Sequence, residues 1–392
     1  MKAITNARIV FPDEIREGTI LTEGRRIIAA GDCGVPAGAE IIDAEGLFAG
    51  PGFIDQHTHG YSRFGEAHSV YGDMKAMAYC HLLHGTTSIT PSPSYSHTLP
   101  EFLQAAAECR EEMKKEKTSI VGLFYEGPFT NPNEGACSDT AWPYSDEACD
   151  RIFEAGGSAI LHCTYAPEMP WGEKFEKILQ KYDVVADIGH TDLSPEDAER
   201  AVRNGAKIVT HLYDAMGCCR GLDSINVTAT LQEQVADILL SIPGLYYELI
   251  CDSCCMHVKP TSIRLAYRTA GEDYIIVVSD STGDNVFRYN DRYPADSPVN
   301  AEDLYYNDAA ELSGSRLCEI DCVRNFMRVT GADIRVGFKV GSTNSAKALR
   351  IFDRVGSIAP GKDADIAFVD KDMYLKKLMF KGDILPEIRV NR

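Results

Sequence analysis

Residues 51–60 read Pro-Gly-Phe-Ile-Asp-Gln-His-Thr-His-Gly, and this stretch directs the interpretation of the chain. Pro51 and Gly52 end a loop, and the apolar pair after them is typical of the start of a short buried strand. Side chains at i and i+2 of a strand face the same side, so we expect His57 and His59 to project together at its carboxyl end. Two such imidazoles suit a divalent metal, but a strand end that is merely polar would give the same pattern.

The middle of the chain repeats a rhythm of strand and helix. Candidate helices include 100–117, 172–182 and 194–204, and Ser194 followed by Pro195 is a favourable start for the last of them. Eight strands that alternate with helices over about 250–300 residues predict an α/β fold of the (β/α)8 TIM barrel type. The candidate strands are 52–54, 87–90, 120–125, 159–163, 184–188, 207–210, 246–250 and 274–278.

Both ends of the chain carry short apolar runs separated by turns, and these predict small antiparallel β-structure. The runs lie at 7–11, 18–21, 26–30, 356–358, 365–370 and 376–390. We therefore expect a small β-sandwich domain formed by both chain ends. Its expected bounds are 1–50 and 352–392, and the catalytic barrel is expected to occupy 51–351.

Length, charge and cysteine usage narrow the class of protein. With 392 residues, the chain is long enough for one large domain and a smaller one. A formal net charge of −19 argues against nucleic acid or an anionic membrane surface as the main partner. We expect a cytoplasmic protein, because no secretory signal opens the sequence and no run approaches the about 18 apolar residues of a membrane span. The 13 cysteines lack zinc-knuckle spacing, which indicates reduced thiols.

Polar residues follow the candidate strands where these end, which is where TIM barrels place their chemistry. Histidines and carboxylates without clustered thiolates suit zinc first, with iron or manganese as alternatives. Glu126, His190 and His211 would supply three protein ligands and leave one position open, which is typical of a catalytic metal site. The residues at the strand ends are His57, His59, Glu126, His190, His211, Asp252 and Asp280.

Hydrolysis of an amide also requires a general base. Asp280, in the run Val-Val-Ser-Asp-Ser at 277–281, is the expected one. The alternative for Asp280 is an N-cap before the next helix. Asp252 is a weaker candidate, for which capping or hydrogen bonding is a sufficient explanation.

The chain resembles the amidohydrolase superfamily, and within it the N-acetylglucosamine-6-phosphate deacetylase family. This resemblance implies a barrel of the metal-dependent hydrolase type that removes acetate from the 2-amino group of a phosphorylated amino sugar. It also implies a homodimer, metal binding by Glu126, His190 and His211, and Asp280 as the acid/base. The matching stretches are 51–55, Tyr-Glu-Gly-Pro-Phe at 125–129, Gly-His-Thr at 189–191, Thr-His-Leu-Tyr-Asp-Ala-Met at 210–216, Met-His-Val at 256–258, 278–281 and 356–365.

The resemblance extends to a second ion and to the substrate. Members differ in whether the first strand carries His-x-His, so His57 and His59 leave open a second metal bridged by Glu126, and one or two ions per chain are expected. His257 and Arg220 would lie near the anionic group of the substrate.

Four segments depart from the family pattern, and one of them, 217–221 after Met216, is shorter than usual. Cys137 stands where the family has a histidine that faces the sugar, and Asp214, before Ala215, stands where the family has an asparagine. A carboxylate 4 Å from a phosphate costs about 1 kcal/mol in bulk water. The segment with Tyr289 and Tyr305, at 285–310, also looks unlike the family and is expected to form a lid.

Two alternatives therefore stay open beside a deacetylase that takes a small amino-sugar substrate. One is an amidohydrolase that acts on a non-phosphorylated N-acyl or cyclic amide, which the changes at Asp214 and Cys137 favour. The other is a non-catalytic scaffold relative, which would be expected to have lost its metal ligands.

Overall fold

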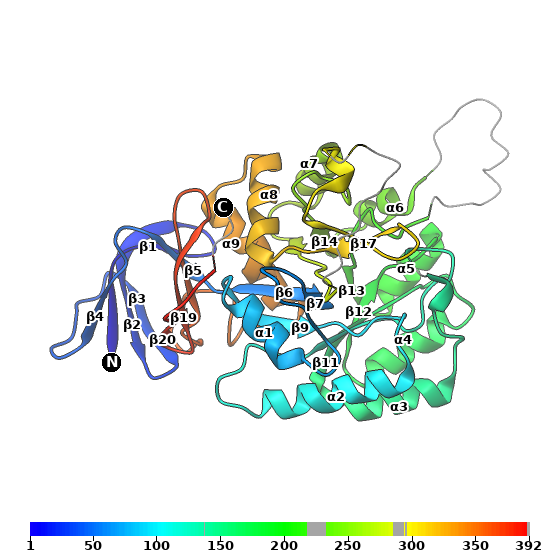
Figure 1. Ribbon diagram of the computed structural model, residues 1–392, viewed down its shortest axis with the longest axis horizontal. Coiled ribbons are helices and arrows are strands. Elements are labelled where there is room, and N and C mark those ends of the chain that lie inside the picture. Colours follow the sequence, from blue (N-terminus) through cyan, green and yellow to red (C-terminus); the bar gives the residue numbers. More distant parts are fainter. Residues whose placement is uncertain (137, 218–232, 285–293, 295, 390–392) are drawn as a thin grey trace.

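The computed structural model describes residues 1–136, 138–217, 233–284, 294 and 296–389. Figure 1 shows two regions joined end to end: a small sheet that contains both the first and the last strands, and a larger region in which helices surround strands. Arg220 and Cys137, both expected near the substrate, lie outside the described residues. The same holds for most of 285–295, so the expected lid is described only from its later part.

The small sheet takes strands from both chain ends, in the order β20-β19-β18-β5-β1-β2-β3 with β4 paired to β1. β18 runs antiparallel to β5, with Ile366 opposite Pro51, so the end of the chain pairs with the strand that leads into residues 51–60. Its strands are β1 (Lys2–Val10), β2 (Ile15–Glu23), β3 (Arg26–Gly31), β4 (Glu40–Asp43), β5 (Phe48–Pro51), β18 (Ile366–Val369), β19 (Leu375–Phe380) and β20 (Asp383–Ile384).

Two details of this sheet differ from the sequence-based expectation. The sheet is mixed, because β1 pairs in parallel with both β4 and β5 while it is antiparallel to β2. The predicted strand at 356–358 is wrong, since this segment is a bend. Gly356 adopts a φ of +84°, and a Cβ there would lie 2.4 Å from that of Ala346, so the residue serves a tight turn against α10 (Asn344–Ala348).

Eight parallel strands follow one another in chain order in the larger region. β6 pairs with β9, and β10 to β15 form a six-stranded sheet. Parallel bridges link β9 to the segment before β10 at Ile89–Ile120, and the ends of β6 and β15 at Thr58–Ser281. The sheet therefore curls until its two edges approach, as in a TIM-type domain. The strands are β6 (Phe53–Thr58), β9 (Thr86–Pro91), β10 (Leu123–Glu126), β11 (Ile160–Tyr165), β12 (Val185–Ile188), β13 (Ala206–Val209), β14 (Tyr246–Ile250) and β15 (Ile275–Val278).

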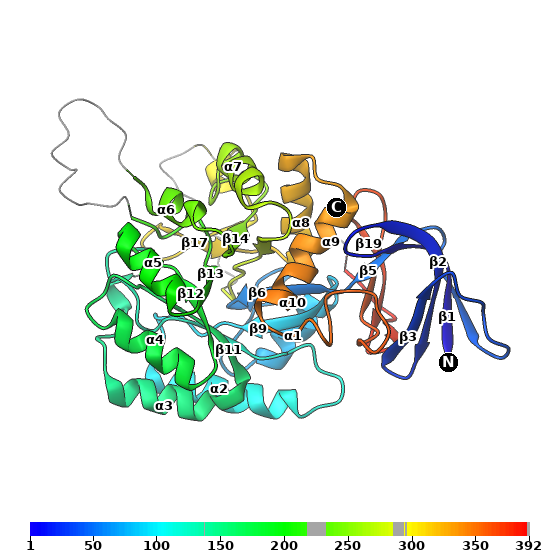
Figure 2. The same cartoon turned by 180° about the vertical axis from the view of Figure 1, so that it is seen from behind.

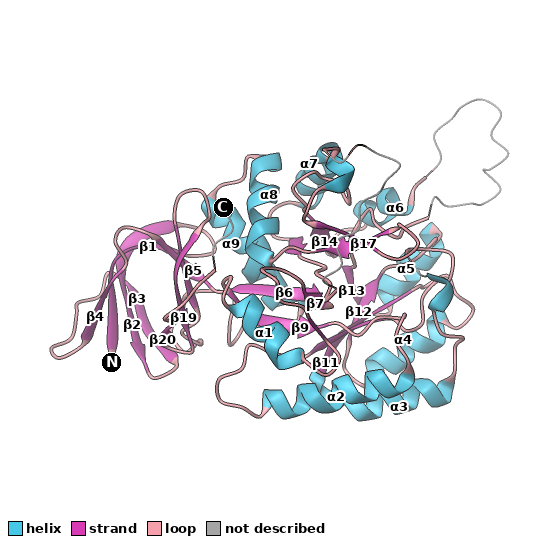
Figure 3. Ribbon diagram, in the orientation of Figure 1, coloured by secondary structure: helices cyan, strands magenta, loops and turns pink. Residues whose placement is uncertain are grey.

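Helices lie on the outside of these strands, as Figures 2 and 3 show. The predicted start of α5 is confirmed: the Ser194 hydroxyl accepts from the Asp197 amide at 3.2 Å, and Pro195 opens the helix. Besides α10, the helices are α1 (Met74–Leu82), α2 (Leu99–Met113), α3 (Asp146–Gly156), α4 (Gly172–Lys181), α5 (Pro195–Arg203), α6 (Val235–Ser241), α7 (Pro260–Ala270), α8 (Glu319–Thr330) and α9 (Ile334–Phe338).

Short elements fill the connections near the strand ends. β7 (Gly60–Tyr61) pairs with β8 (His68–Ser69) directly after β6, and β16 (Leu304–Tyr306) pairs with β17 (Leu312–Ser315) between β15 and α8. The alternative of an N-cap role for Asp280 is therefore wrong, because the described residues 281–284 that follow it do not begin a helix. Among the described residues, no helix is both long and apolar enough to cross a membrane.

Candidate active site

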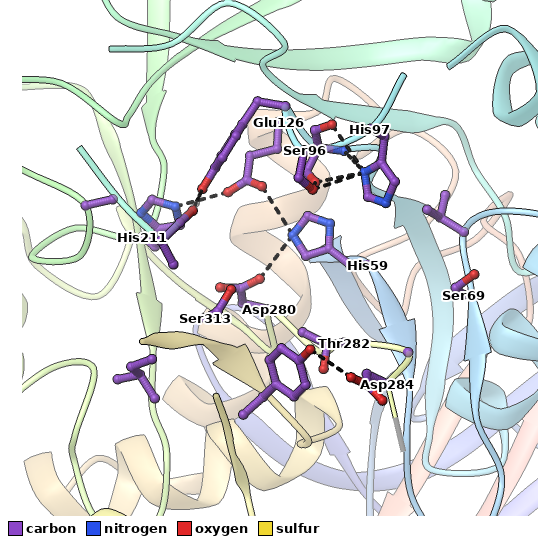
Figure 4. Close-up of a pocket in the computed structure, with 18 of the residues that line it drawn as sticks. His59, Ser69, Ser96, His97, Glu126, His211, Asp280, Thr282, Asp284 and Ser313 are labelled. Carbon is purple, nitrogen blue, oxygen red and sulfur yellow. Dashed lines mark hydrogen bonds and ion pairs between the residues drawn. The ribbon is translucent and has the colours of Figure 1, made fainter. Parts of the chain in front are cut away.

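Six side chains from five strand ends meet at one point in the curled sheet. His57 lies near the end of β6 and His59 just after it, while Glu126 ends β10. His190, His211 and Asp280 follow the ends of β12, β13 and β15. Figure 4 shows Glu126 between His59 and His211, with Asp280 pointing toward His59. The structure thus brings together all the residues expected to bind metal, together with the expected base.

The backbone turns sharply at three of these residues. His190, His211 and Asp280 have φ values of +48°, +30° and +46°, a region that residues other than glycine rarely adopt. Each lies two residues beyond the end of its strand, so the turn directs its side chain inward instead of continuing the pleat. Such conformations cluster at functional sites, where the surrounding structure compensates for their cost.

The four imidazoles are all held through Nδ1. Each Nδ1 lies within hydrogen-bonding distance of an oxygen acceptor, so the hydrogen is placed on Nδ1 and the lone pair of Nε2 is left toward the centre. The Nδ1 contacts are His57 to Glu248 Oε2 at 3.3 Å, His59 to Ser92 O at 2.5 Å, His190 to Glu134 O at 3.0 Å and His211 to Asp214 O at 3.2 Å.

The Nε2 atoms surround the carboxylate of Glu126. Ligand atoms about 2.0–2.1 Å from a tetrahedral ion lie about 3.3 Å from one another, and the observed separations are close to that value. The distances from Glu126 Oε1 are 2.9 Å to His190, 3.2 Å to His211 and 3.4 Å to His57, and Oε2 lies 3.3 Å from His59.

The donors form two groups that share Glu126. We call Glu126, His190 and His211 the primary site, and His57, His59 and Glu126 the second site. The donor set, imidazole nitrogens with carboxylate oxygens, is one that zinc and similar divalent ions accept. The residues present therefore fit one ion or a pair bridged by Glu126.

The electrostatics favour a cation at this point. Burial opposes ionisation of Glu126, but His59, His190 and His211 outweigh it and lower the pKa of the carboxyl well below its usual range. Burial likewise opposes protonation of His211, yet its bond to Glu126 and the charge of Asp214 raise its pKa to about 9. The carboxylates thus draw protons onto the imidazoles, and a divalent ion would take the place of those protons.

A cavity of about 420 Å³ opens above the cluster. His59, Glu126, His190, His211 and Asp280 form part of its wall, beside Asp214 and Asp284. None of the described residues of this wall is a lysine or an arginine. The described part of the cavity therefore has an acidic lining.

A comparison with protein families matches residues 48–385 to the amidohydrolase family. The chain belongs to the amidohydrolase family. This confirms the predicted superfamily, and the match spans both the cluster and the strand β18 that pairs beside residues 51–60.

Alignments with similar amidohydrolases cover most of the chain. N-acetylglucosamine-6-phosphate deacetylase of Lysinibacillus sphaericus is 26% identical to this chain, and the alignment covers 88% of this chain and 88% of that protein. The enzyme of that name from Bacillus subtilis (strain 168) is 27% identical, and the alignment covers 85% of this chain and 83% of that protein. The crystal structure of N-acetylglucosamine-6-phosphate deacetylase from Pasteurella multocida has a TM-score of 0.81 at 22% identity, covering 98% of this chain and 99% of that one. The fold is thus shared over the full length.

Of the residues expected to contact substrate, only some line the cavity of this amidohydrolase in the described structure. Asp214 and Ala215 line it. His257 is buried beside Asp252, which accepts from its backbone nitrogen at 2.9 Å and from its Nδ1 at 3.1 Å. The Nε2 of His257 has no hydrogen-bond partner among the described residues. Asp252 thus has the hydrogen-bonding role that its sequence position suggested.

Sequence reasoning missed a wall of the cavity and a layer beneath the cluster. The wall includes Tyr71, Ser94 and His97, which follow β8 and β9, and Ser313 in β17. Loop residues of this kind carry no periodic signal. The layer beneath includes Glu248, whose place in the apolar run Tyr-Tyr-Glu-Leu-Ile of β14 is itself a signal, because a buried carboxylate requires partners.

Proposed function

We propose that this amidohydrolase is a metal-dependent N-acetylglucosamine-6-phosphate deacetylase. It would hydrolyse the amide of N-acetylglucosamine-6-phosphate to give acetate and glucosamine-6-phosphate. The observation that carries the proposal is the convergence of four Nε2 atoms and two carboxylates at the floor of one cavity. The similarity to deacetylases of that name over most of the chain supports the choice of substrate.

The primary site would hold the first ion and the second site a weaker second one, with zinc expected and iron or manganese as alternatives. Such an ion supplies Lewis acidity, which polarises a carbonyl oxygen and lowers the pKa of water. The protein's contribution is to hold the donors in fixed positions, which the Nδ1 contacts and the burial of the cluster achieve.

Asp280 is proposed as the acid/base. Burial opposes its ionisation, but the charges of His57 and His59 lower its pKa below the usual range, so it starts as a carboxylate. It would accept a proton from the attacking water and return it to the amide nitrogen as the C–N bond breaks, which leaves acetate and a free amine. Asp280 Oδ1 lies 3.2 Å from His59 Nε2, so the base stands at the cluster itself.

His257, Arg220, Asp214, Ala215 and Cys137 are the proposed substrate contacts. His257 is the best placed of the described ones for an anionic group, because Asp252 fixes its ring and leaves Nε2 without a partner. Burial opposes protonation of His257, but its bond to Asp252 and the charge of Asp214 raise the pKa of the imidazole. A protonated imidazole at this position would donate to phosphate.

A second candidate substrate is the same sugar without phosphate, or another non-phosphorylated N-acyl compound. Asp214 and Asp284 on the cavity wall favour it, because a carboxylate near a phosphate is repulsive.

For the whole chain we propose a closed (β/α)8 barrel over 51–351 and a small β-sandwich from 1–50 and 352–392. We also propose a cytoplasmic homodimer. The pairing of β18 with β5 supports a terminal domain built from both chain ends.

The test is acetate release from N-acetylglucosamine with and without the 6-phosphate, measured with metal-loaded protein. We expect faster turnover of the phosphorylated sugar, loss of activity after chelation, and its return when zinc is added. Equal rates on both sugars would favour the second candidate. No acetate from either sugar, with metal bound, would contradict the deacetylase proposal.

A further inference from the structure

The four histidines of the cluster differ in what holds their Nδ1 atoms. His59, His190 and His211 each face a backbone carbonyl, which any sequence supplies. His57 instead faces a side chain, Glu248 Oε2, at 3.3 Å. Among these ligands, His57 is therefore the one whose orientation depends on the identity of a distant residue, 191 positions away in the sequence.

Glu248 can act only as an acceptor at the atoms involved. Its Oε1 accepts from the amide Nε2 of Gln56 at 2.7 Å, and its Oε2 accepts from the backbone nitrogen of His211 at 3.3 Å. Both of these partners are obligate donors. His57 Nδ1 must then supply the hydrogen of the remaining contact, which leaves its Nε2 lone pair toward Glu126 and His59.

The surroundings leave His57 few other arrangements. His57, Gln56 and Glu248 are fully buried. The ring packs edge-on against Phe124, with centroids 4.7 Å apart. Because Gln56 adjoins His57 in β6, Glu248 holds two successive side chains of that strand from β14 across the interior.

We propose that Glu248 is the positioning residue that makes His57 a metal ligand and so enables this chain to hold a second divalent ion beside the first. This inference rests on the metal-binding part of the proposed function. The primary site depends on Glu248 less directly, because carbonyls hold the Nδ1 atoms of His190 and His211, and Glu248 contacts only the backbone nitrogen of His211.

Glu248→Gln tests the proposal, because it keeps the shape of the side chain and removes its charge. An amide presents one acceptor oxygen where the carboxylate presents two, and it carries no charge, so it holds the Nδ1 hydrogen of His57 less strongly than the carboxylate does. We expect the dissociation constant of the second ion to rise about 10–100-fold, while that of the first ion changes much less. The measurements are titration calorimetry of the metal-free protein with zinc and elemental analysis after dialysis.

A matched control is Asp187→Asn, the same chemical change in a buried carboxylate nearby. Asp187 accepts a hydrogen bond from His162 Nδ1 at 2.5 Å and forms no hydrogen bond with the described ligands of the cluster, so both ions should be retained. His57→Gln should lose the second ion, and adding Glu248→Gln to it should cause no further loss. If Glu248→Gln unfolds, Glu248→Asp is used, and an intermediate affinity for the second ion is expected.

Manganese provides a second readout that does not require turnover. Two bridged Mn²⁺ ions give a spin-coupled electron paramagnetic resonance spectrum, which should be present in the wild type and in Asp187→Asn and absent in Glu248→Gln. Two ions bound to Glu248→Gln with wild-type affinity would overturn the inference, as would equal weakening of both ions. Acetate release by the wild type is scored separately, so failure of the deacetylase proposal remains distinguishable.

Discussion

Asp252 accepts a hydrogen bond from His257 Nδ1 at 3.1 Å, and the Nε2 of that histidine is buried without a partner among the described residues. The carboxylate also accepts from the backbone nitrogens of Cys254 and Met256, at 3.0 and 2.9 Å. Asp252 is thus fully engaged in shaping this loop and in orienting one ring. Because Asp252 fixes Nδ1, the Nε2 of His257 remains available for a hydrogen bond, and we expect the substrate to be its partner.

The first prediction concerns the side chain of His257. His257→Asn should raise the KM for N-acetylglucosamine-6-phosphate about 10–100-fold, because a hydrogen bond to a charged group is worth about 1.5–3 kcal/mol. The KM for the sugar without phosphate should change much less. Steady-state kinetics on both sugars gives the answer, and an equal change in both KM values would show that His257 does not contact the phosphate.

The second prediction separates the proposed base from the metal ligands. Asp280→Asn should lower kcat about 10²–10⁴-fold while the metal content stays at the wild-type level. The control is Asp183→Asn, the same change at a side chain that is 89% exposed and pairs with Arg350. Undiminished turnover by Asp280→Asn would show that Asp280 is not the acid/base. Loss of the primary ion in this variant would show that Asp280 is a metal ligand.

The third prediction addresses the acidic wall of the cavity. The Asp214 side chain accepts from the Ala215 amide at 2.9 Å, and an asparagine oxygen can do the same, so Asp214→Asn should keep the loop in place. Removing the charge should raise the preference for the phosphorylated sugar about fivefold, since about 1 kcal/mol of repulsion is relieved. The ratio of kcat/KM for the two sugars measures it. An unchanged ratio would place the phosphate away from Asp214.

Much of the fold and of the cluster was predictable, for one physical reason. Apolar runs such as 274–278 mark buried parallel strands, and a polar residue directly after such a run must lie at the carboxyl edge, as Asp280 does. The partners of residues that act through contacts distant in sequence could not be predicted in this way. Glu248 meets His57 only because β14 and β6 curl toward a common centre, and His97 reaches the cavity through a loop.

The small sheet shows the same limit of prediction from sequence. The short apolar runs at both chain ends predicted strands, but not that β1 would run parallel to β4 and β5. Strand direction depends on the path of the connecting chain, which hydrophobic periodicity does not encode.

The last prediction concerns Glu319, at the start of α8. Its side chain is fully buried, and neither carboxyl oxygen has a partner among the described residues. Burial, with the neighbouring carboxylates of Asp55 and Glu248, raises the pKa of Glu319 well above its ordinary value. The folded protein therefore keeps this proton at pH values where the unfolded chain, with a pKa near 4.5, has lost it.

From this difference the direction of the pH effect follows. Above pH 4.5 the folded state binds more protons than the unfolded state, so the contribution of Glu319 to the free energy of unfolding falls as pH rises, by up to about 1.4 kcal/mol per pH unit until the folded pKa is passed. Glu319→Gln cannot ionise and should remove this slope. Urea unfolding of both proteins between pH 5 and 8 should show the variant gaining stability relative to the wild type as pH increases. Glu199→Gln, at an exposed helical position, is the control and should leave the difference flat. A stability difference between Glu319→Gln and the wild type that does not grow with pH would show that Glu319 ionises normally in the folded protein.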